Sequence, residues 1–352
     1  MNSGPRILFH TYNRRGLGHL MRGLNIAAGL LELNPNADIA FYTRGTPPKE
    51  FIDIDARFFV EPKEDASSWP KLVSAFGPNV IVYDTLLPQT RELDLAVSET
   101  SFVLVMRKCS AGRQAELFTC AIRDRIDRVI IPHEASDYGY PLPNELAAKT
   151  HFVGSIVRRP RESKQAALVA KYGLASRGFT LVSTPGGGGF VDEAKLFFDV
   201  VLHAQQLLET RLPGLRHIVI KGPRYPHAID APSGVTVVDS EPDLVHLFPL
   251  IDLVVSAGGY NTVSEIRVTR TPAAFLPSPR THDDQRERVA KMATAGLAQV
   301  CTATSPAAMA QQIADLCMAP HELSHMRQRY AEDSVTIGNE SAARLIMELA
   351  SG

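Results

Sequence analysis

The sequence is poor in cysteine. Its four cysteines, Cys109, Cys120, Cys301 and Cys317, are scattered along 352 residues and form no CxxC pair. Zinc-ligand spacing is therefore absent, and a disulfide framework is not expected in a chain of this length. We accordingly expect no bound metal, no cofactor and a reducing cytoplasm as the compartment.

Long apolar runs and a charge excess of one sign are also lacking. The amino terminus holds only a short apolar run, and no later window approaches the roughly 18 apolar residues of a membrane span. The formal net charge is −1, so no basic field would attract nucleic acid. We expect a globular chain whose contact with the inner face of a membrane is at most peripheral.

Short apolar runs rich in β-branched residues alternate with segments of helical period. Most runs are continuous, as in strands covered on both faces, which predicts an α/β protein with Rossmann-like, doubly wound parallel sheets. In the first half the expected strands are Arg6–His10, Ile39–Tyr42, Val80–Tyr83, Phe102–Met106, Arg128–Ile131 and His151–Val153. In the second half they are Phe179–Ser183, His217–Lys221, Val235–Val238, Leu253–Ser256 and Ala273–Leu276.

The polar, proline-containing segment Val157–Lys164 (VRRPRESK) marks the expected domain boundary. It predicts one domain over residues 1–157 and a second over residues 158–337, facing each other across a cleft. A final helix within residues 338–352 would pack back on the first domain. The cleft is the default ligand site of such an arrangement.

The first glycine loop, Arg14–His19 (RRGLGH), lies between a strand and a helix. Gly16 and Gly18 either let backbone amides approach an anionic ligand or only form a tight turn. His19 is a candidate general base for an acceptor hydroxyl, or a helix-terminal hydrogen-bonding residue. A dinucleotide loop would have glycine at position 21 and an acid after the second strand, where Met21 and Thr43-Arg44 stand, so NAD is disfavoured.

Two further glycine loops follow strands in the second half. Thr184–Phe190 (TPGGGGF) lacks the GK[ST] of a P-loop, and its glycines indicate either a ligand against the backbone or a mobile loop. Ser256–Glu265 (SAGGYNTVSE) offers amides for phosphate oxygens at a helix start. There Glu265 could accept both hydroxyls of a ribose, or could form a capping box with Thr262.

The last candidate loop is His282–Arg286 (HDDQR), which follows the expected strand Ala273–Leu276. Asp284 and Gln285 offer acceptors and donors suited to sugar hydroxyls, although loops are commonly polar. Asp283-Asp284 has no third oxygen or nitrogen ligand at a helpful spacing, so we expect no metal there.

These loops together resemble glycosyltransferase family 28. The run VVSAGGYNTVSEI followed by DDQR is similar to the family's donor domain, and RRGLGHLMRGLNIA is similar to its first glycine loop. GSIVR at Gly154–Arg158 is similar to the family's GNPVR at the domain junction, and VIVYDT at Val80–Thr85 is similar to related predicted glycosyltransferases. The resemblance implies the GT-B fold and a metal-independent, inverting hexosyltransferase that uses a nucleoside-diphosphate sugar, with UDP favoured.

The resemblance also implies roles for individual residues. The first domain would bind the acceptor. Independently of the resemblance, Asp84 lies at the end of an expected strand, where a cleft-facing acid would lie, so we expect His19 as base and Asp84 as its orienting partner or a substitute base. The resemblance implies that the second domain binds the donor: Glu265 the ribose, with the diphosphate and sugar held by Arg158, Gly186, Gly187, Gly188, Gly189, Gly258, Gly259, Asn261, Thr262, Asp284, Gln285 and Arg286. The family has a second glutamine where Arg286 stands, so N-acetylglucosamine is not implied as the donor sugar.

Other functions remain compatible with these residues. A UDP-sugar hydrolase or 2-epimerase could use the same donor loops, and a non-catalytic nucleotide-sugar binder would need neither His19 nor Asp84. The acceptor is open among a cell-wall lipid, a natural-product aglycone and a carrier-bound small molecule. Arg107-Lys108 and Arg113 could meet an anionic acceptor or a membrane surface, or form a solvated loop.

Overall fold

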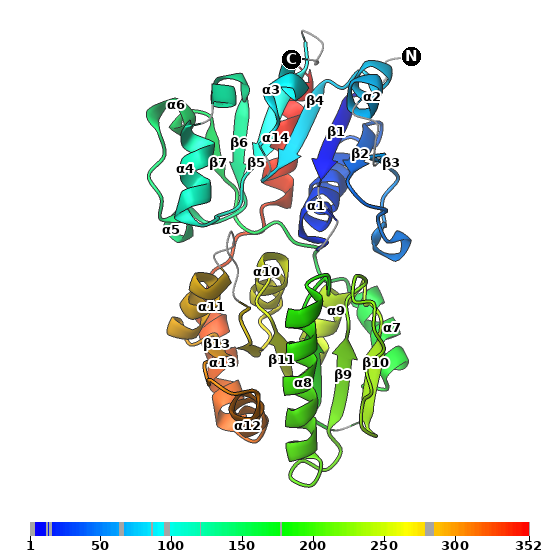
Figure 1. The fold of residues 1–352 in the computed structure, drawn as a ribbon, viewed down its shortest axis with the longest axis vertical. Coiled ribbons are helices and arrows are strands. Elements are labelled where there is room, and N and C mark those ends of the chain that lie inside the picture. The colour runs from blue at the N-terminus through cyan, green and yellow to red at the C-terminus, as the bar shows by residue number, and fades with distance from the viewer. Residues whose placement is uncertain are drawn as a thin grey trace. The chain divides into compact units, whose positions relative to one another are not determined.

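The computed structural model describes residues 4–351 apart from residues 12, 14–15, 63–66, 86, 95–98, 120, 177 and 279–284. The chain forms two compact units, each built around its own parallel sheet (Figure 1). The first unit extends to Val157 and takes in the segment from Thr336 to the carboxyl terminus, and the second begins at Arg158 and ends at Val335.

The sheet of the first unit has strand order β3-β2-β1-β4-β5-β6-β7, and all its strands are parallel. Its strands are β1 Arg6–Thr11, β2 Asp38–Thr43, β3 Arg57–Val60, β4 Val80–Asp84, β5 Ser101–Val105, β6 Arg128–Ile131 and β7 Thr150–Phe152. Its helices are α1 Gly18–Leu33, α2 Ser68–Phe76, α3 Thr90–Asp94, α4 Ala111–Thr119, α5 Ala135–Tyr138, α6 Asn144–Ala147 and α14 Asn339–Ser351. The 3-10 helices are η1 Lys49–Phe51 and η2 Ala121–Arg125.

The sheet of the second unit has strand order β10-β9-β8-β11-β12-β13, again all parallel. Its strands are β8 Thr180–Thr184, β9 Arg216–Ile220, β10 Val235–Val238, β11 Leu253–Ser256, β12 Ala273–Phe275 and β13 Ala298–Val300. Its helices are α7 Glu162–Tyr172, α8 Val191–Leu208, α9 Leu244–Leu247, α10 Tyr260–Thr269, α11 Gln285–Thr294, α12 Pro306–Cys317 and α13 Pro320–Glu332, with the 3-10 helix η3 at Phe248–Leu250.

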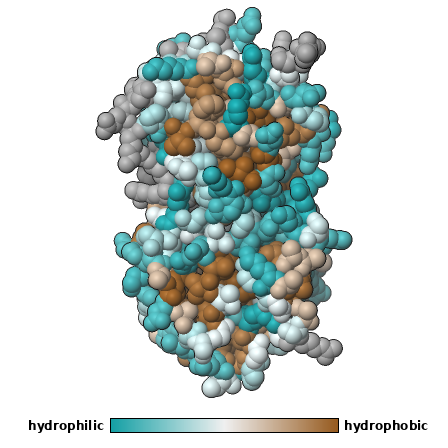
Figure 2. Space-filling view, turned by 90° about the vertical axis from the view of Figure 1, so that its right-hand side faces the viewer, coloured by the Kyte–Doolittle hydropathy of each residue, from teal (hydrophilic) through white to brown (hydrophobic). Residues whose placement is uncertain are grey.

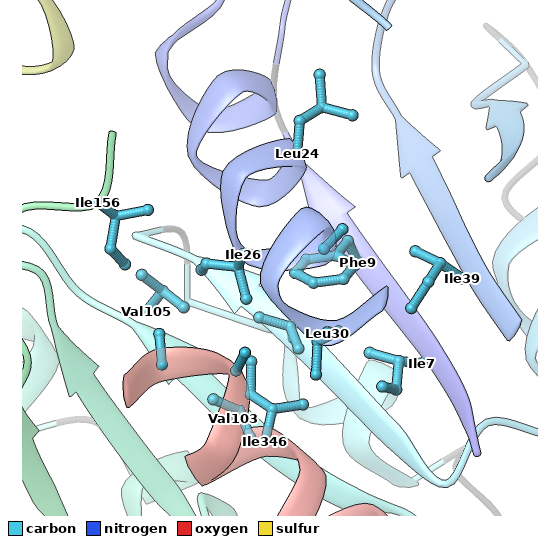
Figure 3. Close-up of a cluster of buried hydrophobic side chains, with 14 of the residues drawn as sticks. Ile7, Phe9, Leu24, Ile26, Leu30, Ile39, Val103, Val105, Ile156 and Ile346 are labelled. Atoms are coloured by element: carbon cyan, nitrogen blue, oxygen red, sulfur yellow. The ribbon is translucent and has the colours of Figure 1, made fainter. Parts of the chain in front are cut away.

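Helices cover both faces of each sheet, so the strands are buried on both sides and their apolar runs are continuous. In the first unit, α1 and α14 pack on one face, where Ile346 of α14 lies beside Leu30 of α1 and Val103 of β5 (Figure 3). The start of α14 is tied down by Asn339, whose side-chain amide accepts a hydrogen bond from the Val157 amide and donates one to the Val157 carbonyl, at 3.1 and 2.7 Å. The final helix therefore belongs to the core of the first unit.

The predicted α/β fold with two doubly wound sheets is confirmed, and each predicted strand overlaps an observed one. Two strands, β3 and β13, were not predicted. Both are short and lie at sheet edges, and β3 is not fully buried at any of its residues. An edge strand needs less apolar sequence, so its pattern is weak.

On the face drawn in Figure 2, hydrophobic residues form patches within each unit that hydrophilic residues interrupt. The large hydrophobic side chains that stand exposed in the described residues are Val60, Phe190, Leu196 and Met318. None of the helices in the described part of the chain combines the length and the apolar character that crossing a membrane requires.

Candidate functional site

The sheets of both units are doubly wound. In each sheet the chain first adds strands on one side of the unit's first strand and then continues on its other side. The reversal falls between β1 and β4 in the first unit and between β8 and β11 in the second. Ligands of such sheets bind outside the carboxyl ends of the strands at this switch point. In the first unit, the first glycine loop follows β1 and Asp84 ends β4; in the second, the two further glycine loops follow β8 and β11. The fold therefore brings the candidates of each unit together at its switch point.

In the first unit, the loop after β1 leads directly into α1. A side chain added at Gly16 or Gly18 would meet no atom within 4 Å, so both glycines border open space. The residue that precedes α1, Leu17, provides no side-chain cap, and the first turn carries no acidic residue. The amides at this helix start are therefore suited to an approaching anion.

His19 lies in the first turn of α1 and points at Asp84, the last residue of β4. Its Nδ1 lies 2.9 Å from Oδ1 of Asp84. The His19 side chain is 26% exposed, and within the described part of the chain nothing bonds its Nε2. An ionised Asp84 can only accept, so Nδ1 carries the hydrogen, and in the neutral form of the ring Nε2 is left as an acceptor.

Asp84 is held by more than the imidazole. Arg22, itself buried, donates from Nε to Oδ2 at 2.8 Å and from a terminal nitrogen to Oδ1 at 2.7 Å. Burial by itself would raise the pKa of Asp84, but the Arg22 guanidinium and then His19 outweigh it and hold that pKa well below its ordinary value. Asp84 is therefore an anion at neutral pH.

Thr85 completes the surroundings of Asp84. Its φ of 57° lies in the left-handed region, which is costly for a β-branched residue. In this conformation its hydroxyl donates to Oδ1 of Asp84 at 2.8 Å and its amide donates to the Val105 carbonyl at 2.7 Å. The strained residue thus supplies a third donor to the same carboxylate oxygen.

In the second unit, the four-glycine loop connects β8 to α8. Gly188, at φ 74°, packs so tightly that an added Cβ would lie 2.7 Å from the Lys221 carbonyl oxygen, whereas Gly186 borders open space. The first turn of α8 carries two acids, Asp192 and Glu193. Carboxylates at a helix start disfavour phosphate, so this loop suits the neutral part of a ligand better than its phosphates.

The glycine turn after β11 has the opposite character. Gly258, at φ 81°, must be glycine because an added Cβ would lie 2.4 Å from Val289, whereas Gly259 faces open space. Gly259 caps α10, whose first turn contains Asn261 and Thr262 and no acid. The amides at the start of α10 therefore form the better phosphate site in the unit.

Glu265 lies one turn further along α10. The helix begins at Tyr260 with Gly259 as its cap, so Thr262 is inside the helix and the capping-box alternative is wrong. Among the described residues, no donor bonds the Glu265 carboxyl. Burial raises its pKa from 4.5 to about 7, and the Arg158 guanidinium opposes this rise. This half-buried carboxyl is therefore available to ligand hydroxyls.

The predicted sugar-binding loop is only partly visible, because Asp284 lies outside the described residues. Gln285 begins α11, is buried, and accepts a hydrogen bond from the Ser278 amide at 3.1 Å through Oε1. Arg286 is exposed. Arg288 was not predicted from the sequence; it donates to the Gly258 carbonyl at 2.9 Å and lies over the Tyr260 ring. Its position one turn after Gln285 could have indicated that it faces the glycine turn.

Arg158 and Lys108 are the remaining cations of interest. Arg158 donates to the Pro242 carbonyl at 3.1 Å while acting electrostatically on Glu265, so it links α10 to the segment before α9. Lys108 is buried, and its ammonium lies 5.1 Å from the centre of the Tyr140 ring. The interpretation of Arg107-Lys108 as a solvated loop is therefore wrong for Lys108.

The described residues contain no group of three or more His, Cys, Asp or Glu side chains placed to hold a metal ion.

Comparisons with known proteins bear on the family and the fold. Residues 188–342 match the glycosyltransferase family 28 C-terminal domain. A UDP-N-acetylglucosamine–N-acetylmuramyl-(pentapeptide) pyrophosphoryl-undecaprenol N-acetylglucosamine transferase from Symbiobacterium thermophilum is 28% identical over 227 residues, 62% of this chain and 57% of that protein. The chain thus spans little more than half the length of this curated relative.

Solved structures show the same fold over the whole chain. The glycotransferase of kitacinnamycin superposes with a TM-score of 0.65 at 14% identity, covering 99% of both chains. Acinetobacter baumannii MurG superposes with a TM-score of 0.61 at 15% identity, covering 98% of this chain and 99% of that one. The two parallel-sheet units therefore have the GT-B fold.

Proposed function

We propose that this chain, which belongs to glycosyltransferase family 28, transfers a sugar from a UDP-sugar to an acceptor hydroxyl. The family domain includes the glycine turn, Glu265 and Gln285. The choice of UDP as the nucleotide of the donor is supported by the relative in Symbiobacterium thermophilum, whose name specifies a UDP-linked donor.

In the donor half of the proposal, Glu265 accepts the ribose hydroxyls, because two vicinal hydroxyl donors match the two oxygens of a carboxylate. The amides at the start of α10, beside Gly259, hold the diphosphate. Arg158 and Arg288 add positive charge near this turn, and Gly186, Gln285 and Arg286 are assigned to the sugar.

The reaction is a single displacement that inverts the anomeric carbon. Nε2 of His19 takes the acceptor proton while the acceptor oxygen forms its bond to that carbon. The bond from the anomeric carbon to the diphosphate oxygen breaks, and UDP leaves with the electron pair. The growing charge on the diphosphate is stabilised by the helix amides and the nearby guanidinium groups.

One observation favours a catalyst over a non-catalytic binder: the 2.9 Å contact between His19 Nδ1 and an ionised, buried Asp84. In the neutral imidazole this contact selects the tautomer whose Nε2 is unprotonated, as a general base requires. A protein that only bound the nucleotide sugar would have no use for it.

The proposal is tested by measuring UDP release from UDP-sugars, first alone and then with a panel of lipid-linked, carrier-bound and small-molecule acceptors. The lipid-linked arm is included because the relative in Symbiobacterium thermophilum is named for a pyrophosphoryl-undecaprenol acceptor. A transferase releases UDP in step with glycosylated acceptor, whereas a hydrolase or epimerase forms product without any acceptor.

The same assay tests the base. His19→Ala should lower turnover by at least about 100-fold and leave UDP affinity unchanged, since a positioned base contributes this much. His321→Ala, at an exposed histidine of α13, is the matched control and should behave as wild type. Near-normal turnover of His19→Ala would exclude His19 as the base.

A further inference from the structure

In the part of the chain that the structure describes, few charged groups contact His19 and its partner Asp84. Among the described residues, the charged groups that contact His19 or Asp84 are these two and Arg22, and the neutral Thr85 hydroxyl is the remaining donor. Both carboxylate oxygens of Asp84 are bonded to Arg22, and Oδ1 also carries the bond to His19. Arg22 is about as buried as Asp84, with 1% of its side chain exposed against 4%.

Arg22 neutralises the carboxylate, and this determines where protons can reside. With Arg22 present, Asp84 is an anion balanced by the guanidinium, and His19 can remain neutral with its hydrogen on Nδ1. Without Arg22, a buried carboxylate would lack its balancing charge, which is costly. The site would then take up a proton in one of two ways.

Either outcome would protonate Nε2. If the proton went to the imidazole, His19 would become a cation with hydrogens on both ring nitrogens. If it went to Asp84, the carboxylic acid would donate to Nδ1, and the neutral imidazole would carry its hydrogen on Nε2. In neither state could Nε2 accept a proton from a substrate.

We propose that Arg22 is a positioning residue whose buried positive charge keeps Nε2 of His19 free of a proton. The inference rests on the proposed role of His19 as the base and goes beyond it, because Arg22 acts through Asp84 without touching the reacting atoms. His19 and Arg22 are three residues apart on α1, so both side chains point to the same carboxylate.

The protonation of the ring is read directly by nitrogen NMR on the 15N-labelled protein without substrate near neutral pH. The His19 signals are assigned by their loss in His19→Gln. Wild type and Arg22→Lys, which keeps the charge, should show an unprotonated Nε2. Arg22→Met, which has a similar unbranched length and no charge, should show a protonated Nε2. An unprotonated Nε2 in Arg22→Met would overturn the proposal.

Arg22→Met could fail to fold, so a second comparison is needed. The double variant Arg22→Met/Asp84→Asn removes both charges and should unfold at a higher temperature than Arg22→Met alone. An equal or lower unfolding temperature would contradict charge compensation. A purely structural role for Arg22 would not predict this recovery, since the double variant restores none of the lost hydrogen bonds.

The activity readout separates this inference from the proposed function. Arg22→Met should lower kcat by at least about 100-fold with little change in the KM for the donor, and Arg22→Lys should recover part of that loss. If wild type transfers no sugar, the proposed function fails whatever the ring nitrogens show. If wild type is active and Nε2 stays unprotonated in Arg22→Met, only the present inference fails.

Discussion

Replacing Glu265 by glutamine should stabilise the ligand-free protein while weakening its binding of UDP. Burial raises the pKa of this carboxyl from 4.5 to about 7, so the folded protein favours the protonated form. The stability that this group contributes is fully present below pH 4.5 and is lost as the pH rises through about 7. The neutral amide of glutamine does not titrate and avoids this loss.

The size of the effect follows from the pKa. At roughly 1.4 kcal/mol per pH unit, the rise would correspond to about 3 kcal/mol, and because Glu265 is only half-buried, solvent screening should reduce it to about 1–2 kcal/mol. Above pH 7, Glu265→Gln should therefore unfold at a higher temperature than wild type. Near pH 4.5 the two proteins should be equally stable.

UDP binding should change in the opposite sense. The ribose hydroxyls need the ionised carboxylate, so wild-type affinity should fall roughly tenfold between pH 8 and pH 6. In Glu265→Gln this pH dependence should vanish, and the affinity at pH 8 should drop by about 10- to 100-fold, the worth of a hydrogen bond to a charged group.

Scanning calorimetry of the free protein and titration calorimetry with UDP measure both effects. Glu209→Gln, at an exposed acid that follows α8, should change neither and is the matched control. If Glu265→Gln bound UDP with the affinity and the pH dependence of wild type, the assignment of Glu265 to the ribose would be refuted. Destabilisation of that variant above pH 7 would show that the carboxylate has a protein partner.

Four further substitutions have expected outcomes. Asp84→Asn should lower turnover by at least about 100-fold in the transfer assay, with UDP affinity kept, and should lower stability by about 3–5 kcal/mol because Arg22 loses its buried partner. Gly258→Ala should lower the unfolding temperature, while Gly259→Ala should fold normally and weaken UDP binding in calorimetry, since only the second glycine borders open space. Ile346→Ala should cost about 2–5 kcal/mol in urea unfolding, as α14 is part of the first unit's core; a change below 0.5 kcal/mol would contradict that packing.

Much of the fold could be predicted because buried parallel strands consist of continuous runs of apolar residues. Val80–Asp84 and Leu253–Ser256 are buried along their whole length, and short runs rich in β-branched residues favour a strand over a helix. The edge strand Arg57–Val60 was not predicted because half of its residues are exposed. Exposed positions need not be apolar, so the sequence of such a strand shows a weaker apolar pattern.

The site was predictable where a loop follows a central strand, and less so where a role depends on burial. His19 and Asp84 were paired from their places after β1 and β4, and the structure sets them 2.9 Å apart, while their catalytic roles stay a prediction. Arg22 was missed because an arginine within a helix is usually solvated, and sequence does not reveal that it is buried. The start of α10 was misjudged because glycine at 259, not threonine at 262, caps the helix.

The central claim, that the second unit holds a UDP-sugar for transfer, is tested most directly by the thermal unfolding of wild-type protein with UDP-, TDP- and GDP-sugars. We expect UDP-sugars to raise the unfolding temperature most, because binding to the folded state alone stabilises it. If no nucleoside-diphosphate sugar raises the unfolding temperature at saturating concentration, the second unit does not hold such a donor.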